Sequence, residues 1–193
     1  MRFSFLRGVA IAALLTGQAW AHADAHSADT AVLTKSSQTS VPLDEVLDVV
    51  AKLSQRRFAV DMDVRDSVEL GRLKLNNIDY GDLLHILARN DLASFESGDI
   101  THIIREVNVR NHPLPLVTGE EANLHDAQWV TYVMSTGEYN AAQLLPKLRP
   151  LLPQSAHMAP LQDPNFLIVA DRWQNVQRIK ALVDALQSPA NPN

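Results

Sequence analysis

Hydrophobic residues at helical spacing open the first patterned stretch of this chain. Leu43, Val46, Leu47, Val50 and Leu53 recur at intervals of three or four residues, the period that places side chains on one face of a helix. Acidic residues lie near the start of this stretch and basic residues near its end, as the helix macrodipole favours. The pattern predicts an amphipathic helix with these five side chains in a core.

The residues after this helix follow the two-residue period of β-strands. Phe58, Val60 and Met62 alternate with small or acidic residues, which predicts a strand with one face in the core and the other in solvent. The phase of the alternation changes at Gly71. We therefore expect a bulge or the start of a new strand at this glycine.

A second helix and a hairpin are predicted to complete the first half of the chain. Asp79 is placed to cap a helix that stops near Asn90, and residues 92–96 and 100–105 are expected to pair around a turn at Gly98. The side chains that this helix is expected to bury are Leu83, Leu84 and Leu87.

The second half predicts the order strand, helix, strand, strand, helix. Strands are expected at residues 129–134, near His157 and at the continuous apolar run 166–170. Between them, a helix that Pro146 distorts is predicted by the stripe Leu144, Leu145, Leu148, Leu151 and Leu152. Asp171 is expected to cap the last helix, with Gln174 at the capping-box position. The core positions of that helix are expected to be Val176, Ile179, Val183 and Leu186.

Composition divides the chain into a signal peptide and two small domains. Arg2 and Arg7, a short apolar run and Ala19-Trp20-Ala21 form the pattern of a secretory signal peptide that is cleaved after Ala21. The run is too short to span a bilayer, so we expect no stable membrane insertion after cleavage. The expected stretches are 1–21, signal peptide; 22–37, flexible lead-in; 38–108, first domain; 109–126, proline-containing linker; 127–188, second domain; and 189–193, tail.

The charge balance of the chain is acidic. Its 193 residues include 17 Lys and Arg against 22 Asp and Glu, a formal charge of −5, and cleavage would remove Arg2 and Arg7. Nucleic acids and anionic lipids select basic surfaces, so this balance argues against both. There is no cysteine. The domains must therefore hold through packing without disulfides, and no cysteine is present to carry a lipid anchor.

Both halves resemble the N-terminal domains of secretins. The second half resembles a KH-like secretin N domain in its βαββα order and in the run Asn165-Phe166-Leu167-Ile168-Val169 before a long helix. The resemblance implies an α+β fold of two small domains, the first with two helices and a mixed sheet, the second KH-like. The first half resembles the short N-terminal domain shared by secretins and TonB-dependent receptors in Val41-Pro42-Leu43-Asp44-Glu45-Val46-Leu47, Phe58-Ala59-Val60-Asp61 and Leu73-Lys74-Leu75-Asn76-Asn77-Ile78.

The resemblance implies a function in protein–protein interaction. It points to a module in the periplasm of a Gram-negative bacterium that serves a secretin-based export machine of the type II secretion or type IV pilus type. A secretin or its inner-membrane partner would be the partner, and a homo-oligomer is a further option. The chain stops before the pore-forming domain of secretins, so we do not expect it to form the pore. Two alternatives stay open, a signalling module that contacts an anti-sigma regulator, as in TonB-dependent receptors, and a remnant of a truncated secretin.

Partner-binding residues are expected at an exposed strand edge in the first domain. Strand addition uses the unpaired backbone groups of an edge, with neighbouring apolar side chains as anchors. The polar stretch before Pro42 and the segment after Gly71 offer such an edge. The candidate residues are Ser37, Thr39, Val41, Arg72, Leu73 and Lys74.

The sequence contains no catalytic constellation. Its serines lie in the lead-in or in turn-like stretches, and it has neither a cysteine nor a G-x-S-x-G motif. We therefore expect no enzyme activity and no cofactor. The Gly-x-x-Gly loop with which KH domains hold a nucleic-acid backbone is also missing, so we expect no nucleic-acid partner.

Metal ligands are grouped only near the N-terminus of the sequence. The acidic residues between 61 and 69 fit a solvated strand face better than a calcium loop, and the seven histidines lack the spacing of a zinc site. Signal cleavage after Ala23, the less favoured site, would instead expose Asp24-Ala25-His26 as an N-terminus. Its amine, amide and imidazole nitrogens suit Cu(II) or Ni(II), which makes Asp24 and His26 the metal candidates.

Overall fold

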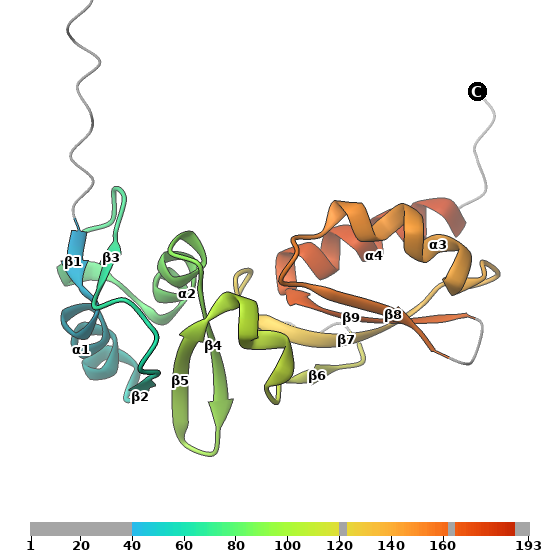
Figure 1. Cartoon of the computed structure of the whole chain (residues 1–193). Helices are drawn as coiled ribbons and strands as arrows, with labels where there is room; N and C mark the ends of the chain where they lie inside the picture. The colour runs from blue at the N-terminus through green and yellow to red at the C-terminus, as the bar shows by residue number, and fades with distance from the viewer. Residues whose placement is uncertain (1–39, 120–122, 162–164, 188–193) are drawn as a thin grey trace, which may run out of the picture. The chain divides into compact units, whose positions relative to one another are not determined.

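The structure is a computed structural model that describes residues 40–119, 123–161 and 165–187. The predicted signal peptide, lead-in and C-terminal tail lie outside these residues, as do Asp24 and His26. Within the described ranges the chain forms four α-helices and three small sheets of two, three and four strands (Figure 1). The α+β class expected from the sequence is confirmed.

The first half contains the two- and three-stranded sheets. In the smaller sheet, β1 pairs antiparallel with β3; in the larger, β5 lies between β2, to which it runs parallel, and β4, to which it runs antiparallel. The elements are β1 Ser40–Pro42, α1 Leu43–Ser54, β2 Arg57–Val60, β3 Ser67–Glu69, the 3-10 helix η1 Leu75–Asn77, α2 Tyr80–Arg89, β4 Leu92–Ser97 and β5 Ile100–Arg105.

Helices α1 and α2 form where the apolar spacing predicted them. The expected positions on α1 are buried except Leu53, whose side chain is 64% exposed, because the helix ends at Ser54 and its last turn projects past the core. Asp79 caps α2 as predicted, since its side chain accepts a hydrogen bond from Asp82 N–H and its own backbone N–H donates one to the Asp82 carboxylate. The buried side chains of α2 are Leu83, Leu84, Ile86 and Leu87.

Two strand expectations in this half are wrong. β2 ends at Val60, and a turn closed by Val64 N–H donating to Asp61 C=O follows, so Met62 is fully exposed instead of lying in the core. Gly71 adopts a φ of +65° and starts a turn, not a new strand or a bulge. Such a φ ends an extended strand and favours glycine, which explains the change of phase in the sequence.

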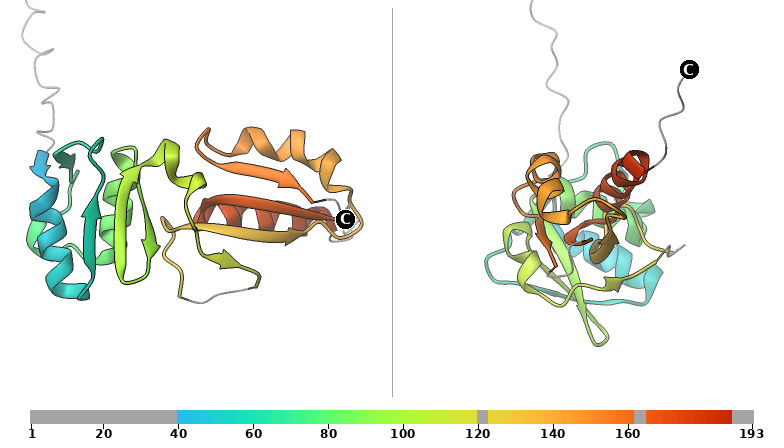
Figure 2. Two further views of the ribbon diagram at one scale, coloured as in Figure 1. Left: turned by 60° about the horizontal axis from the view of Figure 1, so that its bottom comes forward. Right: turned by 90° about the vertical axis from the view of Figure 1, so that its right-hand side faces the viewer.

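The second half builds a four-stranded sheet in the order β6-β7-β9-β8. Helices α3 and α4 lie together on one side of it (Figure 1 and Figure 2). The strand–helix–strand–strand–helix order is confirmed, and β6, which lies within the predicted linker, adds a short parallel strand. The elements are the 3-10 helix η2 Glu106–Asn111, β6 Leu116–Val117, β7 Trp129–Ser135, α3 Ala141–Leu148, the 3-10 helix η3 Arg149–Leu151, β8 His157–Pro160, β9 Phe166–Arg172 and α4 Trp173–Gln187.

The core of this half lies between the sheet and the two helices. Val130, Tyr132 and Met134 alternate along β7 toward the helices and meet Leu167 and Val169 of β9. The helices contribute the predicted side chains Leu144, Leu148, Val176, Ile179 and Val183. The expected core positions Leu151 and Leu186 are 45% and 48% exposed, because the first lies in η3 after α3 has ended and the second in the last turn of α4.

The start of α4 differs from the expected capping box. Asp171 belongs to β9, and its Oδ1 accepts hydrogen bonds from Arg172 N–H and from the side chain of Asn175. The first amides of α4 are satisfied instead by backbone carbonyls, since Trp173 and Gln174 donate to residues 128 and 126. The segment before β7 therefore caps the helix.

Arg149 organises the loop between η3 and β8. Its guanidinium donates hydrogen bonds to the carbonyl oxygens of four loop residues. Five donors in a rigid fork allow this arrangement, which a lysine ammonium cannot reproduce. The four acceptors are Leu152, Pro153, Gln154 and Ala156, at 3.3, 3.0, 3.4 and 3.1 Å.

We expect Arg149→Lys to lower the free energy of unfolding by about 1.5–3 kcal/mol, because hydrogen bonds from a charged group to part-buried carbonyls are lost. Urea unfolding followed by circular dichroism measures the change. Arg65→Lys, at an exposed arginine, is the matched control and should change stability little. Equal losses in the two variants would contradict the role of Arg149.

Candidate docking surfaces

The residues predicted to bind a partner lie in different surroundings. Ser37 and Thr39 are outside the described residues. Val41 pairs with Val68 across the β1-β3 sheet and is only 8% exposed, so its side chain belongs to the core. The free side of β1 has no partner strand within the described chain, and strand addition there stays a prediction.

The other three candidates follow β3 directly. Arg72, Leu73 and Lys74 form an exposed segment between the Gly71 turn and η1, with Leu73 39% exposed. They offer side chains but no strand, so any contact they make with a partner would be through side chains.

A mainly apolar hollow of about 520 Å³ lies beside β1, and the sequence pattern did not reveal it. Pro42, Leu43 and Val60 contribute to its lining, together with Arg65 and Asp66. Val60 was expected in the core because it has the parity of Phe58, yet it is 46% exposed at the end of edge strand β2. In the sequence, the only signal for this hollow was Val60, an apolar residue in the alternating pattern of a strand at the strand's end.

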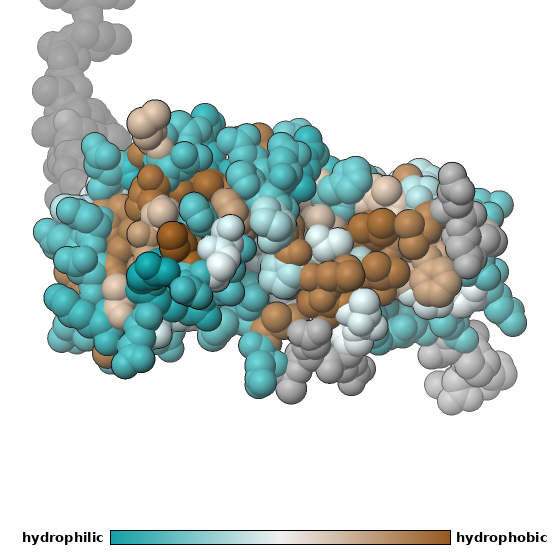
Figure 3. All heavy atoms as spheres, turned by 90° about the horizontal axis from the view of Figure 1, so that it is seen from below, coloured by the Kyte–Doolittle hydropathy of each residue, from teal (hydrophilic) through white to brown (hydrophobic). Residues whose placement is uncertain are grey.

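One face of the four-stranded sheet carries no helix within the described chain. Figure 3 looks at this side, away from α3 and α4, and shows apolar side chains gathered over the sheet. Val133, Ile168 and Ala159 form a row across β7, β9 and β8, because Ile168 is the register partner of both others. We call this surface the outer sheet face; its residues are Leu116, Thr131, Val133, Ala159, Phe166 and Ile168.

The other end of the same sheet side is covered. Trp129 and Arg172 share the parity of the outer sheet face, but Trp129 is 3% exposed and packs with Ile104 and Val109. The Arg172 guanidinium lies 5.7 Å from the centre of the Trp129 ring. The open part of the sheet therefore begins beyond this cluster.

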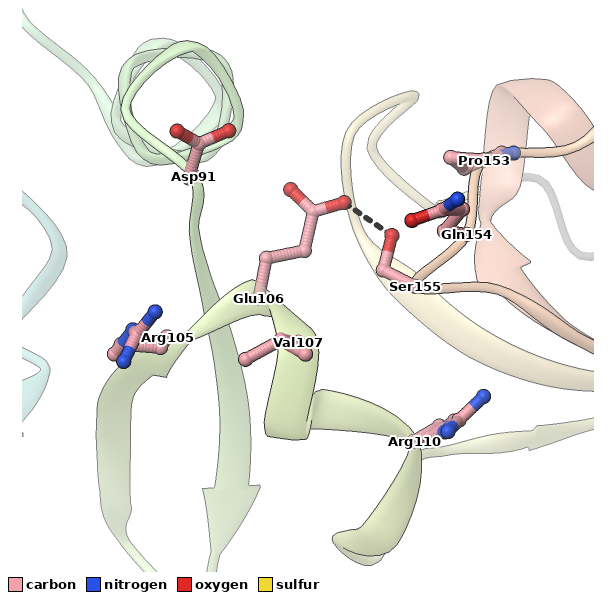
Figure 4. Close-up of a pocket in the computed structure, with 8 residues that line it drawn as sticks. All are labelled: Asp91, Arg105, Glu106, Val107, Arg110, Pro153, Gln154 and Ser155. Atoms are coloured by element: carbon pink, nitrogen blue, oxygen red, sulfur yellow. Dashed lines mark hydrogen bonds between the residues drawn. The ribbon is translucent and has the colours of Figure 1, made fainter.

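Glu106 and Arg172 form a buried ion pair at this covered end. Their side chains are 12% and 14% exposed. Ser155 Oγ donates a second hydrogen bond to Glu106, of 2.6 Å, from the loop that Arg149 organises (Figure 4). The pair joins the end of β5 to the end of β9, and the serine adds the loop before β8.

A buried carboxyl lies next to this pair. Burial raises the pKa of Asp171 above its ordinary value, and the hydrogen bonds from Asn175 and Arg172 and the Arg172 charge offset part of that rise. Within the described residues its Oδ2 has no hydrogen-bond partner. The folded protein thus holds the Asp171 proton more tightly than the unfolded chain does.

No group of three His, Asp or Glu side chains in the described ranges is arranged to hold a metal ion. Among the helices of the described chain, none has the length and apolar character needed to cross a membrane.

We expect Glu106→Gln to lower the free energy of unfolding by about 3–5 kcal/mol, because the change leaves the Arg172 charge buried without a counterion. Urea unfolding measures it. Asp99→Asn is the matched control, since the pair of Asp99 with Arg57 is exposed and should contribute about 0–1 kcal/mol. A loss no larger than that of the control would show that Arg172 finds other compensation.

We expect Asp171→Asn to remove a pH-dependent loss of stability. A raised folded-state pKa favours folding below the unfolded pKa of about 3.9, and this contribution disappears as pH rises through the folded value. The free energy of unfolding of the variant should therefore rise relative to that of the natural protein as the pH increases from about 4. Urea unfolding over a pH series tests this, with the exposed Asp63→Asn as control. Parallel pH curves for the natural protein and Asp171→Asn would contradict the expectation.

No protein-family model matches the chain. The secretin XcpQ of Pseudomonas aeruginosa is 25% identical over 145 residues, which cover 74% of this chain and 21% of that protein. A chain of the Klebsiella pneumoniae type II secretion outer membrane complex, which contains PulD, PulS and the PulC HR domain, aligns with a TM-score of 0.64 at 18% identity.

The structural alignment covers 81% of this chain and 27% of the Klebsiella chain. The chain thus spans only about a fifth of the curated secretin that it matches. The chain is therefore similar in sequence to a type II secretion secretin, and its described part shares its fold with a chain of a type II secretion complex.

Proposed function

We propose that this chain is a periplasmic docking module of a type II secretion machine. It would bind a full-length secretin or the inner-membrane partner of a secretin, without catalysing a reaction. The proposal is supported by the similarity to XcpQ and by the fold shared with the Klebsiella complex. XcpQ is a secretin and the Klebsiella chain belongs to a type II secretion complex, so a role in protein transport is the nearest extension to this chain.

The partner classes follow from the composition of that complex. PulD is accompanied there by PulS and by the HR domain of PulC. A module with the fold of a secretin N-terminal region can meet the same two kinds of surface, a neighbouring secretin subunit and an inner-membrane component. The signal peptide predicted at residues 1–21 would deliver it to the periplasm, where these surfaces are accessible.

The outer sheet face is the observation that carries the proposal. Its row Val133, Ile168 and Ala159 is apolar and half-buried, and Leu116 beside it is 62% exposed. Contiguous apolar surface of this kind marks interaction sites on soluble proteins. Covering it would contribute roughly 25 cal/mol for each square ångström of apolar area removed from water. We therefore place the contact with a secretin subunit on this face.

The β1 region is the second contact in this proposal. The predicted edge at β1 and the apolar hollow lined by Pro42, Leu43 and Val60 lie next to each other, since Pro42 belongs to both. An extended segment paired with β1 could place an apolar side chain in the hollow. We assign this contact to the inner-membrane partner, with Arg72, Leu73 and Lys74 as neighbouring side chains.

Affinity limits how such a module can act. A single copy lacks the avidity that linked subunits gain in a ring, so one contact alone gives modest binding. Self-association of the chain would restore this avidity. A homo-oligomer, which the sequence leaves as an option, is therefore compatible with docking on a ring.

The test is in-cell crosslinking of an affinity-tagged full chain, followed by purification and mass spectrometry. We expect a full-length secretin or its inner-membrane partner among the crosslinked proteins. Ile168→Asp should reduce recovery of the secretin about tenfold or more, because a carboxylate in the apolar row must be desolvated on contact. Leu53→Asp, at an exposed leucine of α1, is the matched control and should retain recovery.

Unfolding by urea shows whether Ile168→Asp still folds, and the milder Ile168→Thr provides a second variant with a β-branched side chain. Recovery of the chain alone, or of a regulator linked to a receptor, would refute the secretion function. Equal loss of the secretin in Ile168→Asp and Leu53→Asp would refute the placement of the contact on the outer sheet face.

A further inference from the structure

A second hollow, of about 610 Å³, lies between η2 and the loop before β8 (Figure 4). It is separate from the outer sheet face, because none of its lining residues belongs to that face. Its volume is within the range of about 300–1,000 Å³ that ligand sites occupy. Its lining includes Asp91, Arg105, Val107, Arg110, Pro153 and Gln154, besides Glu106 and Ser155.

Both walls of this hollow are held in place before any ligand enters. On one side Glu106 is fixed by its ion pair with Arg172 and by the hydrogen bond from Ser155. On the other side, the loop carrying Pro153 is held by the Arg149 guanidinium. A site with fixed walls needs little ordering when a ligand binds, which favours affinity.

The charge of the hollow is opposite to that of the chain. The Glu106 charge is compensated by Arg172. The other charged residues of the lining are Arg105 and Arg110, which are positive, and Asp91, which is negative. Both arginines are exposed, and neither has an ion pair or a side-chain hydrogen bond within the described residues. The whole chain carries a formal charge of −5, which makes the excess of positive charge in this hollow a local feature. Such an excess attracts an anionic ligand.

An apolar side chain, that of Val107, lies between the two arginines in the sequence of η2 and its start. Val107 occupies η2 two residues after Arg105 and three before Arg110, and it is 56% exposed. Pro153 lines the opposite wall, and Gln154 beside it offers an amide that can donate and accept hydrogen bonds. The ligand that fits this lining combines negative charge with an aliphatic group and peptide-like hydrogen bonding.

We propose that this hollow binds a short extended segment of another protein, in which two carboxylate side chains flank an aliphatic one. The guanidinium groups of Arg105 and Arg110 would each receive a carboxylate, a pairing that suits their planar forks. The aliphatic side chain would lie against Val107 and Pro153. The site goes beyond the proposed docking function and does not require it.

A selection of short random peptides displayed on phage, with the full chain as target, tests the proposal. Counter-selection against the double variant Arg105→Glu/Arg110→Glu removes peptides that bind elsewhere. We expect the enriched peptides to share two acidic residues on either side of an aliphatic one. In fluorescence anisotropy, each single charge reversal should weaken the enriched peptide about tenfold, or ~1.4 kcal/mol.

Two controls make the outcome specific. Arg65→Glu reverses the charge of an exposed arginine outside this hollow and should leave the affinity unchanged. Ile168→Asp should also leave it unchanged, which separates a failure here from a failure of the secretin contact. Urea unfolding confirms that the arginine variants remain folded.

Four results would overturn the proposal. They are no enrichment, an enriched pattern without carboxylates, equal weakening by Arg65→Glu, and complete displacement of the peptide by inorganic phosphate. The last would reduce the hollow to a general anion site.

Discussion

The buried pair of Glu106 and Arg172 is the interaction on which the arrangement of the described surfaces depends. Glu106 directly follows β5, and Arg172 ends β9, 66 residues later in the chain. Removal of either charge would leave the other unpaired in a mostly buried site. Separating the two segments therefore costs much free energy. Trp129 under the Arg172 guanidinium and the apolar residues Ile104 and Val109 extend the contact.

This contact decides which surfaces stay open. It covers the end of the four-stranded sheet at Trp129 and leaves the row through Ile168 without a covering element among the described residues. Through Ser155 it also positions the loop before β8, which forms one wall of the hollow beside η2. An apolar face and a hollow with an excess of positive charge thus share no lining residue, which suits the docking function proposed above.

The helices and most strands could be predicted from periodicity because each buries one continuous face. The core faces of α1, α2 and α4 follow the predicted spacing, and the hairpin of β4 and β5 turns at Gly98, which has a φ of +59°. The errors lie at the ends of elements. Met62 has the parity and Leu186 the spacing of a core residue, but both lie beyond the last buried position and are exposed. Periodicity predicts which face of an element is buried, but it does not predict where the element ends.

The sequence by itself determined the α+β class, the order of the elements and the likeness to secretin N-terminal domains, since local period and turn residues carry this information. Only the tertiary structure decided the pairing of Glu106 with Arg172 and the place of Asp171 in β9. It also decided the exposure of Val107 between two arginines in a hollow. These features join segments that are distant in the chain. Their energies come from burial and from charge in a dehydrated site, which no local pattern of residues records.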